Sequence, residues 1–408
     1  MTGRPRPPVP AAATAAAVAA AFAPHALALA RRWRRMRKNE LARQVGVTAA
    51  AVSQYELGQA RPSAAALARL ALALAMPVEF FAAGHPVPVT SGQAHFRSLR
   101  TTSQAERDQA ESFGELAWRV VEVIERQLRL PRLRLPQLEL AEPTGPAEVR
   151  AAAVTAREAF GLGTAPVPHM VRLLESAGVI VLALPDVSER VDAFSHWYGQ
   201  RPFVFLNPGK EDRARSRMDA AHELGHLLMH HDAEPGSQLL ERQASAFASE
   251  FLAPSAKLRD DLPGRLDFDR LHELKRRWGI SLKALVYRGH DLGVYREHTY
   301  RRGMALLARW GFPEPGDLGP REQPSMLGRA VELLAGQERT PGHREGTVVG
   351  HREGTVVGHR EGTAVGRLAV RAGLPAELTA AVLAAGSEHL PELEIVAERV
   401  GRPDGSAP

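Results

Sequence analysis

Cysteine is absent from this chain of 408 residues. Its absence excludes disulfide bonds, thiolate catalysis, iron–sulfur clusters and cysteine-type zinc fingers. Any metal must therefore be bound by imidazole and carboxylate groups, for which the chain has 16 histidines and 46 acidic residues. The 44% hydrophobic and 24% charged residues are near the globular average, which excludes a wholly disordered or fibrous protein. The length predicts two or three domains.

Long hydrophobic runs are also missing. The nearest approach is the alanine-rich stretch 11–30, which Pro24 and His25 interrupt and a basic helical segment follows. It has no cleavage site of a signal peptide, and no other stretch reaches the ~18–20 apolar residues that a membrane helix needs. We therefore expect a soluble, cytoplasmic protein with no membrane partner.

Positive charge is concentrated near the N-terminus, although the formal net charge is only +6. Between positions 31 and 43 a single acid, Glu40, accompanies the basic residues Arg31, Arg32, Arg34, Arg35, Arg37, Lys38 and Arg43. A charge run is more often a solvated helix face than a binding site, so its interpretation depends on the sequence that follows.

A pair of short helices is predicted next, over 38–45 and 49–57, separated by Gly46-Val47-Thr48 and ended by Gly58. Glycine adopts the left-handed turn conformation at no steric cost, and the Thr48 hydroxyl can cap the second helix. The spacing is that of a helix-turn-helix.

The stretch ELARQVGVTAAAVSQYELGQARPS resembles the XRE-type, lambda-repressor-like helix-turn-helix. The resemblance implies an operator of double-stranded DNA, bound by a homodimer with the second helix in the major groove. Gln54 is the side chain there that can make a bidentate contact, typically to adenine. Lys38 stands where the family commonly has glutamine, and a protein-interaction use of the module is the alternative. The implied DNA-binding residues are Lys38, Arg43, Thr48, Ala49, Ala50, Ser53 and Gln54.

An HExxH motif occupies positions 222–226. On a helix, His222 and His226 fall on one face and offer two imidazole nitrogens to one Zn²⁺. Glu223, the next residue, is suited to act as a general base toward a water molecule.

A third metal ligand is predicted in the segment ERQA, where helical spacing directs Glu241 and Ala244 to one side. The acid would coordinate and the small residue would allow close packing on the HExxH helix. Glu250 is the alternative ligand, and Asp232 and Glu234 also lie nearby in the sequence. His230 and His231 are expected at an exposed helix end.

The segment RSRMDAAHELGHLLMHH, together with ERQASAFASEFLAP, resembles the ImmA/IrrE family of metallopeptidases, regulatory proteases that cleave repressors. The resemblance implies a zinc endopeptidase with His222, His226 and Glu241 as ligands and Glu223 as catalytic base. Its substrate would be a repressor or the chain itself, for which the joint 84–93 offers an accessible backbone. His196 or Tyr198 could stabilise an oxyanion, although a structural role is favoured for both. The alternative is a ligand-sensing regulator, responding to short-chain acyl metabolites, whose peptidase fold performs no turnover.

Near the C-terminus the octapeptide HREGTVVG occurs at 343–350 and 351–358, and HREGTAVG at 359–366. A period of eight is far below the 20–50 residues of solenoid repeats, so we interpret these copies as an expanded linker between two helical segments. Their recurring histidines, His343, His351 and His359, are not expected to bind metal.

The fold class predicted from these patterns is mainly α, with an N-terminal all-α helix-turn-helix module followed by a small α+β, zincin-like metallopeptidase domain. A long amphipathic helix is expected over 104–130, a helix over 168–178, and strands over 178–185 and 201–208. The predicted divisions are a flexible extension (1–21), the helix-turn-helix domain (22–83), a linker with the long helix (84–144), the metallopeptidase domain (145–300), C-terminal helices (301–340), the repeat linker (341–366) and a helical tail (367–408).

Overall fold

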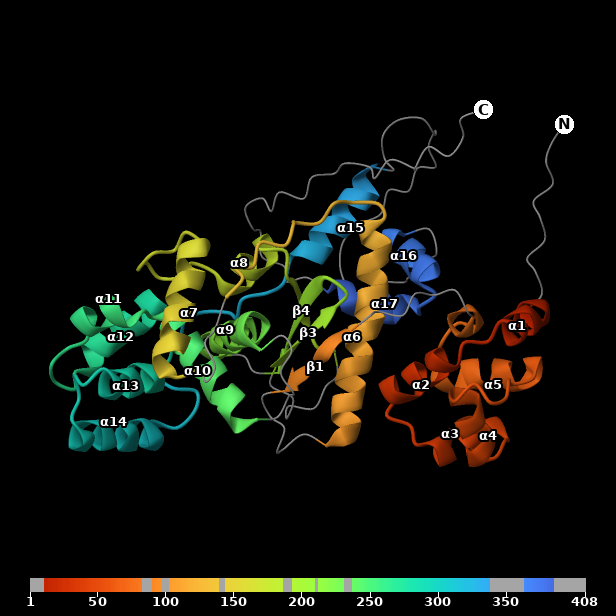
Figure 1. Cartoon of the computed structure of the whole chain (residues 1–408), viewed down its shortest axis with the longest axis horizontal. Coiled ribbons are helices and arrows are strands. Elements are labelled where there is room, and N and C mark those ends of the chain that lie inside the picture. The colour runs from red at the N-terminus through yellow and green to blue at the C-terminus, as the bar shows by residue number, and fades with distance from the viewer. Residues whose placement is uncertain are drawn as a thin grey trace, which may run out of the picture.

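A computed structural model describes residues 11–82, 90–96, 103–138, 144–185, 193–209, 212–230, 237–337 and 363–384, with only the backbone described for 90–96. These residues are mainly helical and contain one four-stranded sheet, which confirms the predicted fold class. Figure 1 shows the N-terminal helices grouped at one end and α6 (Gln104–Glu125) standing between them and the sheet.

The N-terminal group comprises α1 (Ala11–Ala20), α2 (Pro24–Trp33), α3 (Lys38–Val45), α4 (Ala49–Glu56), α5 (Ala64–Leu74) and the 3₁₀ turn η1 (Val78–Phe81). The prediction of a flexible extension over 1–21 is wrong for 11–20, because these residues form α1 and pack against α5 and η1. Alanine has the highest helix propensity, and Ala15 and Val18 are buried in this contact. Residues 1–10 lie outside the described residues.

The helix-turn-helix geometry follows from two local interactions. Gly46 has a φ of 70°, and the Thr48 hydroxyl accepts a hydrogen bond of 3.1 Å from the Ala51 amide. The turn and the start of α4 are therefore set by the residues that the sequence singles out. Arg69 then donates to the Val45 carbonyl at the end of α3, at 2.7 Å, which ties α5 to the pair.

The sheet contains β1 (Thr90–Phe96), β2 (Ile180–Ala183), β3 (Ala193–Tyr198) and β4 (Arg201–Leu206) in the spatial order β1-β3-β4-β2. β2 pairs with β4 in parallel, and β3 is antiparallel to both β4 and β1. β2 and β4 match the strands predicted from their apolar sequences. The sequence analysis does not predict β1 and β3, whose residues TSGQAHF and AFSHWY mix polar and apolar side chains.

The two faces of the sheet belong to different cores. Phe194, Tyr198 and Phe205 face α6, whereas Val204 and Leu206 face the second group of helices. Gly114 lets α6 approach closely, because a Cβ atom there would lie 2.0 Å from the Tyr198 hydroxyl. The segment predicted as a linker, 84–144, therefore supplies both an edge strand and a central helix of the fold.

The N-terminal helices dock on α6 through aromatic and polar contacts. The ring of Trp33 stacks on Phe113 with centroids 5.7 Å apart, and the Arg119 guanidinium lies over the Phe80 ring at 4.7 Å. Gln109 donates to the Trp33 carbonyl at 3.2 Å. One continuous apolar core therefore runs from the helix-turn-helix through α6 to the sheet.

The second group of helices covers the other face of the sheet (Figure 1). Its core includes Phe247, Phe251 and Trp278, all fully buried. The elements are α7 (Pro146–Ala159), α8 (Met170–Ser176), α9 (Arg213–Met229), α10 (Gln238–Leu252), α11 (Ser255–Asp261), α12 (Phe268–Trp278), α13 (Leu282–Asp291) and α14 (Glu297–Trp310).

Three C-terminal helices, α15 (Met326–Gln337), α16 (Ala364–Ala372) and α17 (Ala376–Leu383), return to the middle of the molecule, where α16 and α17 contact α6. α15 also contacts both of them, so the helices on either side of 338–363 are neighbours. The prediction of a linker over 341–366 is wrong for 364–366, because α16 begins at Ala364, inside the third repeat. The first two repeats and part of the third lie outside the described residues.

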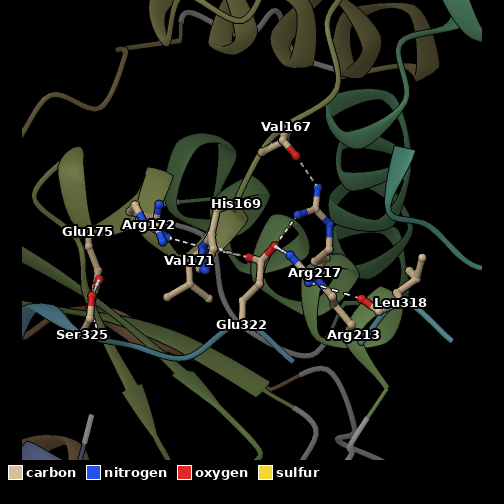
Figure 2. Close-up of polar contacts among 10 residues, drawn as sticks. All are labelled: Val167, His169, Val171, Arg172, Glu175, Arg213, Arg217, Leu318, Glu322 and Ser325. Atoms are coloured by element: carbon tan, nitrogen blue, oxygen red, sulfur yellow. Dashed lines mark hydrogen bonds and ion pairs between the residues drawn. The ribbon is translucent and has the colours of Figure 1, made fainter. Parts of the chain in front are cut away.

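The connecting segment 311–325 joins α14 to α15, and buried carboxylates anchor its second half (Figure 2). Glu322 forms an ion pair with Arg217 of α9 and accepts a hydrogen bond of 3.0 Å from the Val171 amide. Glu175 accepts from the amides of Ser325 and Met326, both at 2.9 Å, at the start of α15. These contacts hold the C-terminal helices to α8 and α9.

Glu175 makes the stability of the fold pH-dependent. Burial raises its pKa to about 7, although the hydrogen bonds from Ser325 and Met326 act in the opposite direction. Because the folded state then binds the proton more tightly than the unfolded state, the free energy of unfolding should fall as the pH rises from about 4.5 to 7, by on the order of 3 kcal/mol. Glu175→Gln should remove this part of the pH dependence. Denaturant unfolding of both proteins between pH 5 and 8 measures the difference, and parallel curves would contradict it.

Candidate metal centre and DNA-binding surface

The HExxH helix α9 packs closely on α10. Asp212 caps α9 by accepting a hydrogen bond of 2.6 Å from the Arg215 amide. A Cβ atom at Gly225 would lie 3.3 Å from the Ala244 Cα atom, so the small residues on the two helices allow the close packing that the sequence predicts. This contact brings the first turn of α10, which contains Glu241, to the histidines of α9.

Three side chains converge between these helices. The Nε2 atoms of His222 and His226 are 3.1 Å apart, and the Glu241 carboxylate oxygens lie 3.3 Å from the first and 3.4 Å from the second. Tetrahedral Zn²⁺ with ligand bonds of about 2.0–2.1 Å places its donor atoms about 3.3 Å apart. The donor set and its spacing fit a zinc ion with three protein ligands, and no other such group of histidine and acidic side chains occurs within the described residues.

Glu241 is ionised at neutral pH in this environment. Burial alone would raise the pKa of its carboxyl group, but hydrogen bonds and charge interactions with His222 and His226 lower it to about 2. A negatively charged oxygen donor completes the two imidazoles, which is the composition that catalytic zinc sites use.

A chain of buried hydrogen bonds orients His226. Its Nδ1 atom lies 3.0 Å from Nδ1 of His230. The Nε2 atom of His230 lies 3.0 Å from Oε1 of Gln243. The side-chain amide of Gln243 in turn donates to the Thr144 carbonyl at 2.9 Å. Since Oε1 of Gln243 only accepts, His230 must carry its proton on Nε2 and accept at Nδ1 from His226. This assignment leaves the Nε2 lone pair of His226 directed at Glu241 and available to a metal.

His230 corrects a prediction. From the sequence it is expected at an exposed helix end, but it is only 4% exposed and lies between His226 and Gln243. The i+4 spacing from His226 already indicates that it shares the metal-facing side of α9. His231 lies outside the described residues.

Two serines complete the surroundings of the histidines and of Glu223. The Ser245 hydroxyl is 3.2 Å from Nδ1 of His222, and the Ser195 hydroxyl donates to Oε2 of the buried Glu223 at 2.8 Å. Ser195 comes from β3, the strand beside α9. Neither serine is predicted from the sequence. The i+4 spacing of Ser245 from Glu241 is a usable signal, whereas nothing in the sequence connects Ser195 to Glu223.

The residues expected to contact DNA lie on the outer side of the helix-turn-helix. Arg43, Thr48, Ala49, Ala50 and Gln54 are exposed, while Lys38 and Ser53 are half-buried. Figure 1 shows α3 and α4 at the lower edge of the N-terminal group. This surface is accessible to a duplex.

The basic cluster divides into two parts. Arg31 and Lys38 both pair with Glu56, and Lys38 also donates to the Ser53 hydroxyl at 3.0 Å. Arg34 donates to the Leu74 carbonyl at 2.8 Å. Some of the charge therefore stabilises the domain itself, while exposed Arg43 has none of these internal roles.

Comparison with known families identifies both regions. The family model for a helix-turn-helix domain matches residues 27–81, and the model for an IrrE N-terminal-like domain matches residues 174–290. The chain is a fusion of these two domains. Both resemblances predicted from the sequence are confirmed, and the second domain has a metallopeptidase-like fold. A search of curated proteins finds no match.

Within the IrrE-like domain, the structure gives the alternative ligand Glu250 partners other than the metal centre. Glu250 forms an ion pair with Arg288 at 2.6 Å and accepts hydrogen bonds from the Ser255 amide and hydroxyl at 2.7 and 2.8 Å. It serves as a structural carboxylate, so the choice of Glu241 over Glu250 agrees with the geometry. Asp232 and Glu234 lie outside the described residues.

His196 and Tyr198 of the IrrE-like domain point away from Glu223. Successive residues of a strand face opposite sides, so Ser195 faces α9 and both of these rings face α6. Their centroids are 4.8 Å apart in an edge contact. The structural role favoured for both residues agrees with this placement.

None of the helices in the described parts of the fusion is long and apolar enough to cross a bilayer.

Proposed function

We propose that this fusion is a DNA-binding transcriptional regulator whose IrrE-like domain is a zinc-dependent endopeptidase. One observation supports the proposal best. The donor atoms of His222, His226 and Glu241 lie 3.1–3.4 Å apart, and the helix that carries the two histidines, α9, also carries Glu223. The substrate would be a repressor protein or the chain itself. A binding-only site would need neither a buried carboxylate beside the donor set nor a hydroxyl that orients it.

Each residue of the site has a distinct chemical role in this proposal. His222, His226 and Glu241 would hold Zn²⁺, which supplies Lewis-acid activation of water and of the peptide carbonyl. Glu223 accepts the proton of the attacking water and delivers it to the leaving amine. Ser195 holds the Glu223 carboxylate by donating to Oε2. His230 and Gln243 fix the tautomer and the ring plane of His226.

The helix-turn-helix domain would bind an operator as a homodimer, with α4 in the major groove. Ala49, Ala50, Ser53 and Gln54 would face the base edges, Thr48 would lie at the groove as the cap of α4, and Lys38 and Arg43 would contact phosphates. Exposure of Gln54 and Arg43 supports this arrangement.

A ligand-sensing regulator is the second candidate, and one observation favours it. The apolar core that contains Trp33 and Phe113 continues to Phe205 on one face of the sheet. The other face of the same sheet carries Ser195, which donates to Glu223 of α9. A ligand such as a short-chain acyl metabolite that displaced the sheet would therefore change the surface on which the DNA-binding domain docks, without peptide-bond hydrolysis.

Zinc binding distinguishes Glu241 from Glu250. Loss of a hydrogen-bond partner of a metal ligand weakens metal affinity by about 10–100-fold. Glu241→Gln removes a charged ligand itself, so it should weaken zinc affinity by more than about 100-fold. Glu250→Gln is the matched control. It should retain zinc but lower the free energy of unfolding by about 1–3 kcal/mol, since Arg288 loses one of its two carboxylate partners and keeps Asp291. Competition with a chelator and denaturant unfolding measure the two effects. Equal zinc affinities in the two variants would exclude Glu241 as a ligand.

Peptide-bond hydrolysis should depend on Glu223. Replacing it in Glu223→Gln removes the base and should slow cleavage by about 10²–10⁴-fold while leaving zinc content and DNA binding unchanged. Mass spectrometry of new protein termini in cells carrying each form measures cleavage, and mapping of bound genomic DNA in the same cells is the control. New termini that persist in the variant would refute the endopeptidase. Operator affinity that shifts with a small molecule, without any new termini, would support the sensor instead.

Base recognition should depend on Gln54. Gln54→Ala should weaken binding to a duplex selected by the wild-type protein by about 1–3 kcal/mol, with the loss confined to one base position. Gln238→Ala, an exposed glutamine on α10, is the control and should bind as the wild type does. Fluorescence anisotropy at fixed salt provides the affinities. A uniform loss over all duplex sequences would contradict direct readout by Gln54.

A further inference from the structure

A groove of about 680 Å³ lies beside the proposed zinc ligand Glu241. Its walls are the start of α7, the outer side of α10 and the end of α13. Glu241 and Ser245 belong both to this groove and to the metal centre, because Ser245 contacts His222. The groove is therefore adjacent to the metal centre, on the side of α10 that faces α7 and α13.

The groove exposes apolar surface from two helices. Leu239 of α10 is 51% exposed and Tyr287 of α13 is 53% exposed, and both line it. Leu239, Arg242 and Ala246 are spaced i, i+3 and i+7 on α10, which corresponds to about 10 Å along a helix. That length matches about three residues of an extended peptide.

The groove lining contains three arginines and two carboxylates, and the carboxylates, Glu241 and Asp291, already contact the metal-site histidines and Arg288. Arg150 and Arg242 are exposed in its lining, and neither has an acidic partner at ion-pair distance within the described residues. The other arginine of the lining, Arg288, is already neutralised by Glu250 and Asp291, at 2.6 and 2.9 Å. The two exposed guanidiniums are thus available to carboxylates of a bound molecule.

We propose that this groove is a substrate subsite that selects an extended acidic peptide segment. Carboxylate side chains within about three residues of the cleaved bond pair with Arg150 and Arg242, and an apolar side chain of the same segment covers Leu239 and Tyr287. The distance between the acidic segment and the cleaved bond rests on the proposed endopeptidase function. Peptide binding itself requires no turnover, so the two can be tested separately.

The test uses the full chain, loaded with Zn²⁺ and carrying Glu223→Gln so that no probe is consumed. The probes are two fluorescein-labelled 12-residue peptides of alternating Leu and Glu or alternating Leu and Lys. The Glu peptide should bind at least about tenfold more tightly, and Arg150→Glu with Arg242→Glu should reverse this preference. The matched control, Arg276→Glu with Arg309→Glu, makes the same change of net charge at exposed sites outside the groove lining and should keep the preference.

Fluorescence anisotropy at two salt concentrations gives the affinities, and circular dichroism verifies that the variants fold. A preference that survives the reversal of Arg150 and Arg242, or that the control pair also removes, would overturn the subsite. Selective binding by a chain whose unmodified form cleaves no protein would leave the subsite in place and refute the endopeptidase. If the unmodified chain cleaves protein but its preference for the Glu peptide does not depend on Arg150 and Arg242, the endopeptidase would stand and the subsite would be refuted.

Discussion

The close packing of α9 against α10 is the constraint on which the metal centre depends. The histidines are fixed on α9 by their helical spacing, but Glu241 belongs to a different helix and reaches them only because Gly225 and Ala244 leave no bulk between the two backbones. A branched side chain at either position would separate the helices and move the carboxylate away from the imidazoles. Precise ligand spacing is thus a result of backbone packing rather than of the motif alone.

Helix α6 has a comparable role for the molecule as a whole. It packs on the sheet through Phe113 and Gly114, receives the helix-turn-helix at Trp33, and contacts the C-terminal helices. Because these contacts belong to one continuous core, the DNA-binding domain is not simply tethered to the IrrE-like domain by a linker. The sheet and the docking surface thus contribute side chains to the same buried cluster.

The sequence predicts those features that depend on local spacing. The i, i+4 pair of His222 and His226, the turn at Gly46 and the cap at Thr48 are all encoded within a few residues, and the structure reproduces them. Features that depend on tertiary contacts are missed. The pairing of Ser195 with Glu223 joins a strand to a helix 28 residues later, and β3 itself is not recognised because its polar residues interrupt the apolar pattern.

The docking of Trp33 and Arg119 against Phe113 and Phe80 has a consequence for any break in the chain between residues 83 and 102. Such a nick would remove the covalent connection between α5 and α6, but the buried contacts between α2 and α6 would remain. The two fragments would persist as a noncovalent complex, whose lifetime is set by this interface and not by the rate of hydrolysis. Release of the DNA-binding fragment would then be a separate event, sensitive to dilution and to any partner that competes for α6.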